Sequence, residues 1–275
     1  MKKSANQFAN VRPPAVAGRF YPQGADELRH MVADFLRNIK PDAAPVPKAV
    51  IAPHAGYIFS GPIAASACAR FAPARDVIRR VVLIGPSHHA AFDGLAASSA
   101  EAFETPLGLV PVDTAAVRGI CSLPQVALVD EAHAREHALE VQLPFLQVVL
   151  DEFKIVPLLT GSATDSEVAE VIGALWDGPE TRFVISSDLS HYHDYAEARE
   201  LDLTTSHAIE EFRGEDISEP QACGRISIRG LLRAAQPRGL HARTVDLRNS
   251  GDTAGPRNEV VGYGAFVLEE AVAAG

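Results

Sequence analysis

Four short runs of apolar residues constrain the fold of this chain more than any other feature. Within each run successive residues are apolar, and valine and isoleucine are frequent; the runs are residues 49–52, 81–84, 155–159 and 183–185. Strands that are apolar on both faces are typical of parallel sheets, because crossover helices cover both sides of such a sheet. The sequence therefore predicts buried strands at the centre of a layered structure.

Amphipathic helices are expected between these strands. Residues 25–39 carry apolar side chains at the three- and four-residue spacing that places them on one helix face. Residues 164–176 repeat this spacing, and Thr164 with Glu167 matches the capping box that begins many helices. Strands that alternate with helices indicate an α/β fold. We predict a single domain over residues 1–275, with a central, largely parallel or mixed sheet flanked by helices.

Two further elements follow from local signals. Residues 260–268 have the apolar composition of a strand, which is expected to be antiparallel or at an edge of the sheet. Another helix is expected to begin with Pro62 as its first residue, after a turn between Gly56 and Gly61, because proline is favoured at that position.

The charge balance narrows the classes of partner. Hydrophobic residues make up 47% of the chain, enough for a sizeable core, and 25 basic against 35 acidic residues give a net charge of −10. A chain this acidic is unsuited to the phosphate backbone of nucleic acids. Neither a secretory signal nor an apolar run long enough to cross a membrane is seen. Three cysteines, an odd count, indicate reduced thiols and therefore a cytoplasmic protein. From the charge and the short apolar runs we expect it to bind neither nucleic acid nor membrane.

Histidine follows three of the predicted strands. His54, His88 and His191 each come shortly after one of the apolar runs, and Asp188 precedes the last of them. The carboxyl ends of neighbouring parallel strands meet at one edge of a sheet, where open α/β proteins bind their ligands. Imidazoles grouped with a carboxylate are ligands that suit iron, zinc and copper. The sequence therefore predicts a metal site at this edge.

Cys223 is a further candidate ligand. It precedes a predicted helix over residues 228–235 and is close to Arg225, and both features favour a thiolate. Thiolates bind soft and borderline metals. Cys68 and Cys121 lie in predicted helices among small and apolar residues, so we interpret them as packing residues.

A competing metal motif lies in the middle of the chain. His133, Glu136 and His137 match the H-x-x-E-H pattern, in which two histidines of one helix bind zinc and the glutamate is the general base of a peptidase. Pro144 follows soon after, and His133 comes directly after an expected loop, which disfavours a continuous helix. The alternative is that His137 and Glu140 point into the crevice from a helix that begins near residue 136.

Seven segments together resemble the Memo family, and in particular its prokaryotic branch, which is also called AmmeMemoRadiSam system protein B. Gln142 stands where the eukaryotic branch tends to carry histidine and Ala138 where it often carries serine, and both residues fit the prokaryotic branch. The segments occur in the family's order and span nearly the whole chain: residues 15–22, 51–57, 85–89, 136–144, 186–191, 222–225 and 260–263.

This resemblance implies a fold similar to that of the class III (LigB-type) non-haem iron extradiol dioxygenases. It also implies an iron or copper site held by His54, His88 and Cys223, with Asp188 and His191 as two further pocket residues. Prokaryotic members often accompany a radical SAM enzyme and an AMMECR1-like protein, so these are the expected partners. The dioxygenases use a carboxylate ligand where this chain has cysteine, which argues against ordinary catechol cleavage.

Two functional hypotheses stand beside the zinc peptidase. The first is a metal-dependent redox enzyme, dioxygenase-like or oxidase-like, that uses iron(II), with copper as the alternative. His191 would then be the acid/base group, oriented by Asp188, while His137 and Glu140 would line the pocket. The second is a binding module that keeps the enzyme scaffold and recognises a peptide or a partner protein. A small-molecule or peptide ligand is expected, but the sequence does not identify it. The sequence assigns no role to His89, Tyr192 and His193.

Overall fold

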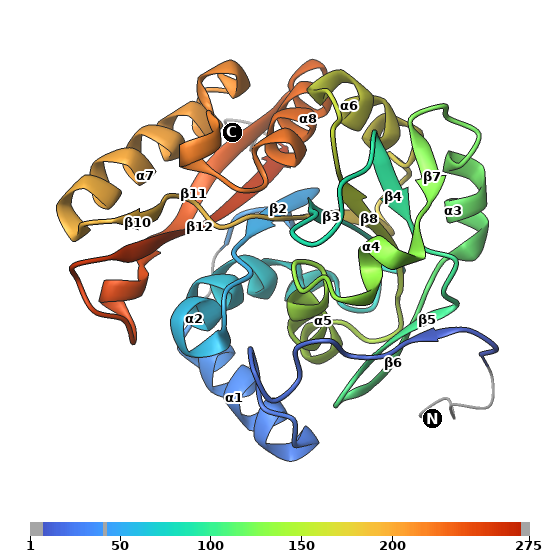
Figure 1. Cartoon of the computed structure of the whole chain (residues 1–275), viewed down its shortest axis with the longest axis horizontal. Coiled ribbons are helices and arrows are strands. Elements are labelled where there is room, and N and C mark those ends of the chain that lie inside the picture. Colours follow the sequence, from blue (N-terminus) through green and yellow to red (C-terminus); the bar gives the residue numbers. More distant parts are fainter. Residues whose placement is uncertain (1–7, 41–42, 271–275) are drawn as a thin grey trace.

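A mixed sheet of nine strands, with helices on both sides, organises the computed structural model, which describes residues 8–40 and 43–270 (Figure 1). Eight strands follow one another by hydrogen bonding, and β11, Leu240–Asn249, pairs with β12 in addition. In spatial order they are β10 His191–His193, β12 Val260–Glu270, β2 Ala49–Ala52, β9 Thr181–Ser186, β3 Arg80–Pro86, β8 Lys154–Thr160, β4 Leu95–Ala97 and β7 Val126–Leu128.

The four predicted strands form the parallel centre of this sheet. Strands β2, β9, β3 and β8 are neighbours, and each pair runs parallel. Their apolar side chains are almost all buried, which agrees with the cover that helices give to both faces. The prediction of an α/β fold with a mixed sheet flanked by helices is confirmed.

The C-terminal strand β12 lies inside the sheet. It is antiparallel to β2 on one side and to β10 and β11 on the other. The predicted direction is therefore confirmed, whereas the alternative of an edge position is wrong. Residues 262–268 of β12 are buried, and partners on both sides satisfy their backbone groups.

Two groups of helices cover the sheet (Figure 1). Helices α1, α2 and α5 lie on one side, and α6, α7 and α8 lie on the other. Their bounds are α1 Ala25–Arg37, α2 Tyr57–Cys68, α5 Leu143–Val149, α6 Asp165–Ala174, α7 Tyr195–Glu210 and α8 Arg225–Ala235. Near β7 and β4 lie α3 Thr114–Ile120 and α4 Asp130–Ala134, and a small second sheet joins β1 Val11–Arg12, β5 Ala102–Thr105 and β6 Gly108–Pro111.

Local sequence signals give two different outcomes. The predicted capping box is present at α6, where the Thr164 hydroxyl accepts from the Glu167 amide and the Glu167 carboxylate accepts from the Thr164 amide. The prediction for Pro62 is wrong, because α2 begins at Tyr57 and contains this proline in its second turn. In the part of the chain that the structure describes, no helix is both long and apolar enough to cross a bilayer.

Candidate metal centre

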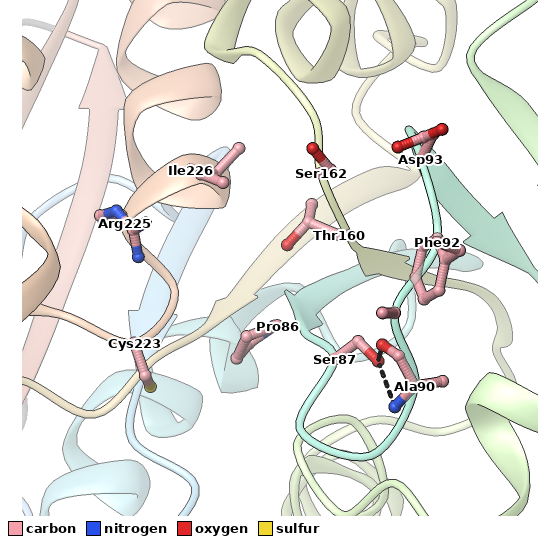
Figure 2. A pocket seen from close by; sticks show the side chains of 12 residues that line it. Pro86, Ser87, Ala90, Phe92, Asp93, Thr160, Ser162, Cys223, Arg225 and Ile226 are labelled. Atoms are coloured by element: carbon pink, nitrogen blue, oxygen red, sulfur yellow. Dashed lines mark hydrogen bonds between the residues drawn. The ribbon is translucent and has the colours of Figure 1, made fainter.

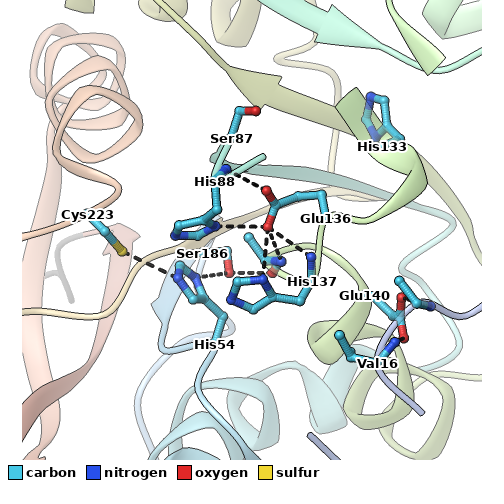
Figure 3. Close-up of polar contacts among 12 residues, drawn as sticks. Val16, His54, Ser87, His88, His133, Glu136, His137, Glu140, Ser186 and Cys223 are labelled. Carbon is cyan, nitrogen blue, oxygen red and sulfur yellow. Dashed lines mark hydrogen bonds and ion pairs between the residues drawn. The ribbon is translucent and has the colours of Figure 1, made fainter. Parts of the chain in front are cut away.

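Three side chains from distant segments meet at the carboxyl edge of the parallel strands (Figure 3). His54 follows β2, His88 follows β3, and Cys223 comes two residues before α8. One ligand atom from each of the three lies within 4.8 Å of the others. Sγ of Cys223 is 3.3 Å from Nε2 of His54, and the two imidazole centroids are 5.2 Å apart. Two imidazoles and a sulfur in this arrangement can hold a borderline metal ion.

A glycine allows the cysteine to come this close. A Cβ on Gly224 would lie 2.7 Å from Cβ of Ser187 and 2.8 Å from the carbonyl oxygen of Ser186. The amide of Gly224 instead donates to Oγ of Ser187 at 2.9 Å. The turn that carries Cys223 can therefore press against the end of β9, next to the histidines.

The hydrogen bonds of Ser186 fix the tautomer of His54. The Ser186 hydroxyl donates to the carbonyl oxygen of Ala138 at 2.6 Å and accepts from Nε2 of Gln142 at 3.0 Å. Its remaining lone pair faces Nδ1 of His54 at 2.9 Å, so Nδ1 must carry the proton. Nε2 of His54 then presents its lone pair toward Cys223, as a metal ligand would.

Glu136 orients His88 in the same way. Its carboxylate accepts from the backbone amide of His88 at 2.6 Å and from Nδ1 of that residue at 2.9 Å, as well as from the amides of His137 and Ala138 at 2.8 and 2.9 Å. Burial opposes the ionised form, but these hydrogen bonds and the charge of His88 outweigh it and lower the pKa of Glu136 to about 2. The carboxylate thus fixes Nδ1 of His88 as the protonated nitrogen and leaves Nε2 free.

Burial sets the protonation of the other two ligands. It lowers the pKa of His54 to about 3, with nearby His88 acting in the same direction. It raises the pKa of Cys223 to about 12, and the charge of Asp188 adds to this effect. The expectation that the helix end and Arg225 would favour a thiolate is therefore wrong for the protein without metal. A metal ion would have to displace the thiol proton.

Asp188 lies against His54 rather than against His191. Its Oδ1 accepts from the His54 amide at 2.7 Å, and its Oδ2 is 3.9 Å from Nε2 of the same residue. Burial raises the pKa of Asp188, and His191 is among the neighbouring charges that oppose this shift. Among the described residues no hydrogen bond joins Asp188 to His191, which lies at the start of β10 and is partly exposed.

Of the two residues predicted to line the pocket, His137 and Glu140, only His137 lies at the site. His137 belongs to the site, since its ring stacks on that of His88 with centroids 4.6 Å apart. Burial and the charge of His54 lower its pKa to about 4. Glu140 does not line the pocket: its carboxylate accepts from Arg12, from the Tyr21 hydroxyl and from two backbone amides of the N-terminal segment. Figure 3 shows it apart from the histidines.

The zinc peptidase motif does not form a helical site. Helix α4 ends at Ala134, before Glu136 and His137, so the two histidines do not share a helix face. Nε2 of His133 lies 3.1 Å from the carbonyl oxygen of Ala96, and the ring is buried away from the other histidines (Figure 3). The separation removes the geometry that the peptidase hypothesis requires.

Other residues near the site were either missed or left without a role. Sequence reasoning missed Ser186 and Gln142, although the position of Ser186 at the end of β9 was a usable signal. His89 lies at the rim, with its ring centroid 6.2 Å from that of His137. His193 instead faces Glu197, with Nδ1 3.1 Å from a carboxylate oxygen. Tyr192 has a positive φ of 62° and is 72% exposed.

Comparison with known proteins places this chain in a family. The model of the family described as "Memo-like protein" matches residues 12–267. A MEMO1 family protein of Aquifex aeolicus is 36% identical over 265 residues, which covers 92% of this chain and 97% of that protein. A MEMO1 family protein of Aeropyrum pernix is 37% identical over 281 residues, with coverage of 93% and 98%.

A solved structure supports the fold independently. The crystal structure of uncharacterized protein JW3007 from Escherichia coli K12 superposes with a TM-score of 0.50 at 13% sequence identity, and the match covers 80% of this chain and 98% of that one. This likeness concerns the fold alone. The match of the family model and the identity to curated relatives over nearly their whole length decide the classification: this chain belongs to the Memo family.

Proposed function

We propose that this Memo-family protein holds a non-haem metal ion through His54, His88 and Cys223 and acts as a metal-dependent redox enzyme. The observation that carries the proposal is the mutual approach of their ligand atoms within 4.8 Å. The side chain of His54 is only 2% exposed and that of His88 is 30% exposed, so the group is open on one side. Such a site keeps access for a substrate, as catalytic metal sites require.

The donor set fits iron or copper. Hydrogen bonds to Ser186 and Glu136 occupy Nδ1 of both imidazoles, which leaves two nitrogen lone pairs and one sulfur for the metal. We propose iron(II) as the metal and keep copper as the alternative, since imidazole and thiolate ligands suit both. When bound, either metal would supply one-electron redox chemistry.

Proton transfer is assigned to groups beside the metal ligands. His191 is partly exposed and close enough to contribute to the electrostatics of both His54 and Asp188. We assign to His191 the role of acid and base for the bound substrate. Asp188 accepts a hydrogen bond from the backbone amide of His54. Because burial raises its pKa, this carboxyl group can carry a proton next to His54.

Metal analysis of a double variant tests this assignment. The protein is purified anaerobically without an affinity tag that loads metal, and its iron and copper contents are measured. His54→Ala with Cys223→Ala is expected to lose the metal, because two of three ligands are gone. His30→Ala with Cys121→Ala removes the same residue types away from the site and is expected to keep it. Equal metal content in the two double variants would refute the site.

A binding module remains the second candidate because of Tyr192. This tyrosine is 72% exposed, and its ring centroid is 5.7 Å from that of His191, so an aromatic anchor of the kind found in interfaces stands close to the proposed acid–base group. The partners that we propose for this function are a radical SAM enzyme and an AMMECR1-like protein. A stable complex of either with the double variant, lost in Tyr192→Ala, would favour binding over catalysis.

A further inference from the structure

A cavity of about 570 Å³ opens beside the sulfur of Cys223 (Figure 2). The ends of β3 and β8 and the first turn of α8 form its walls. Its volume lies within the range of about 300–1,000 Å³ that is common for small-molecule sites. Ser186 and Glu136, which orient the two histidine ligands, do not line this cavity.

The cavity carries opposite charges on opposite walls. Figure 2 shows Arg225 on one side and Asp93 on the other, with Thr160 and Ser162 between them. Arg225 is the first residue of α8, where the helix dipole adds to its positive charge. The backbone of Asp93 pairs with that of Ser162, which fixes the position of this acidic residue on the far wall.

Neither charge is neutralised strongly within the protein. The guanidinium of Arg225 lies 3.5 Å from the carboxylate of Glu219, whose side chain is 80% exposed, and ion pairs of this kind contribute little. Asp93 makes no ion pair among the described residues. Phe92, close to Asp93, and Ile226, close to Arg225, give the cavity apolar surface (Figure 2).

We propose that this cavity binds a small zwitterion whose anionic group contacts Arg225 and whose cationic group contacts Asp93. An apolar stretch of several atoms would join the two groups and lie along Phe92 and Ile226, so an ω-amino acid is the matching class of ligand. The proposal rests on the proposed function in one respect: a ligand held here, next to Cys223, would be the substrate of the metal site.

Calorimetric titration of the metal-free protein tests the charges separately from the metal. The probes are ε-aminocaproate, which carries both charges, caproate, which carries only the anion, and hexylamine, which carries only the cation. We expect ε-aminocaproate to bind about tenfold more tightly than either of the others, because each charge finds a partner. Equal affinities for the three probes, or no saturable binding at millimolar concentration, would overturn the proposal.

Four variants locate the binding. Asp93→Asn is expected to lower the affinity for ε-aminocaproate to that for caproate and to leave caproate binding unchanged. Arg225→Gln is expected to lower the affinity for both probes that carry a carboxylate, ε-aminocaproate and caproate. The exposed residues Asp76 and Arg118 provide the controls Asp76→Asn and Arg118→Gln, which should change nothing. The assignment of the two charged contacts would be contradicted if Asp93→Asn and Arg225→Gln changed the affinity for all three probes equally.

The metal-site variant separates this proposal from the proposed function. His54→Ala removes a metal ligand that does not line the cavity, so it should keep the zwitterion affinity while losing metal. Loss of binding in Arg225→Gln with normal metal content would support the cavity alone. If the wild type had normal metal content but did not bind the zwitterion, the cavity proposal would be refuted and the metal-site proposal would still hold.

Discussion

Sγ of Cys223 lies 3.3 Å from Nε2 of His54, although 169 positions separate the two residues in the chain. The contact depends on three structural facts: β2 ends at the centre of the sheet, Ser186 turns the imidazole, and Gly224 lets the cysteine approach. The supports that Ser186 and Gly224 provide can each be changed by one substitution that leaves the three ligands in place, so these two can be tested one at a time.

Removal of the Ser186 hydroxyl should weaken metal binding without removing a ligand. In Ser186→Ala, Nδ1 of His54 loses its acceptor and the amide of Gln142 keeps only its bond to the carbonyl oxygen of Pro53, so neither the tautomer nor the orientation of the His54 ring is fixed. Loss of such a support typically costs about 10- to 100-fold in metal affinity. Competition with a chelator under anaerobic conditions measures this loss. Ser122→Ala, at an exposed serine, is the control, and equal affinities in the two variants would show that Ser186 is not a support.

Neutralising Glu136 should lower the pKa of His88 in the metal-free protein. Burial alone would lower this pKa, but the hydrogen bond and the charge of Glu136 raise it above the ordinary value. Glu136→Gln removes the charge, so burial is expected to prevail and the His88 resonances should titrate at lower pH in an NMR experiment. Asp76→Asn, at an exposed carboxylate, is the control and should leave the His88 titration unchanged. An unchanged His88 titration would mean that Glu136 does not set its protonation.

The sheet could be predicted from sequence because burial on both faces leaves a local signature. Strands β2, β3, β8 and β9 carry runs of successive apolar residues, which a parallel sheet buries because helices cover both of its faces. The location of the site followed from the rule that ligands bind at the carboxyl ends of parallel strands. Both inferences use only neighbouring residues and general topology.

The direction of individual side chains depends on distant contacts and was not predictable. Glu140 was expected in the pocket, but it belongs to a single 3-10 turn, Glu140–Gln142, and turns toward Arg12, 128 positions earlier. Likewise, the raised pKa of Cys223 comes from burial and from Asp188, neither of which is visible in the residues next to the cysteine. Local sequence could identify these residues but not their surroundings.

The Arg12–Glu140 pair should be essential for stability. Both side chains are buried, and Arg12 also donates to the carbonyl oxygens of His133 and Glu136, which flank the start of the loop that carries His137. Arg12→Ala leaves a carboxylate buried without its cation, and changes of this kind cost about 3–5 kcal/mol in the free energy of unfolding. Urea denaturation measures the loss.

Two further variants identify the cause of that loss. Arg12→Ala combined with Glu140→Gln should recover part of the stability, because the unpaired charge is gone. Arg19→Ala at an exposed arginine should change the free energy of unfolding by less than about 0.5 kcal/mol. If Arg12→Ala were as stable as Arg19→Ala, the buried pair would contribute nothing.

Asp202 should make the protein less stable as the pH rises. Burial raises the pKa of this carboxyl from 3.8 to about 6, so its contribution to stability is complete below about pH 3.8 and is lost as the pH rises through about 6. Asp202→Asn cannot ionise and keeps an oxygen to accept from the Ser190 amide, which lies 3.0 Å from the native carboxylate. The variant should gain stability over the wild type, by up to about 3 kcal/mol near pH 8, from 1.36 kcal/mol per pKa unit. Urea denaturation of both proteins between about pH 4 and 8 cancels the titration of the shared histidines, and Asp76→Asn is the control at an exposed position. Parallel pH profiles for Asp202→Asn and the wild type would mean that this carboxyl is not held neutral by burial.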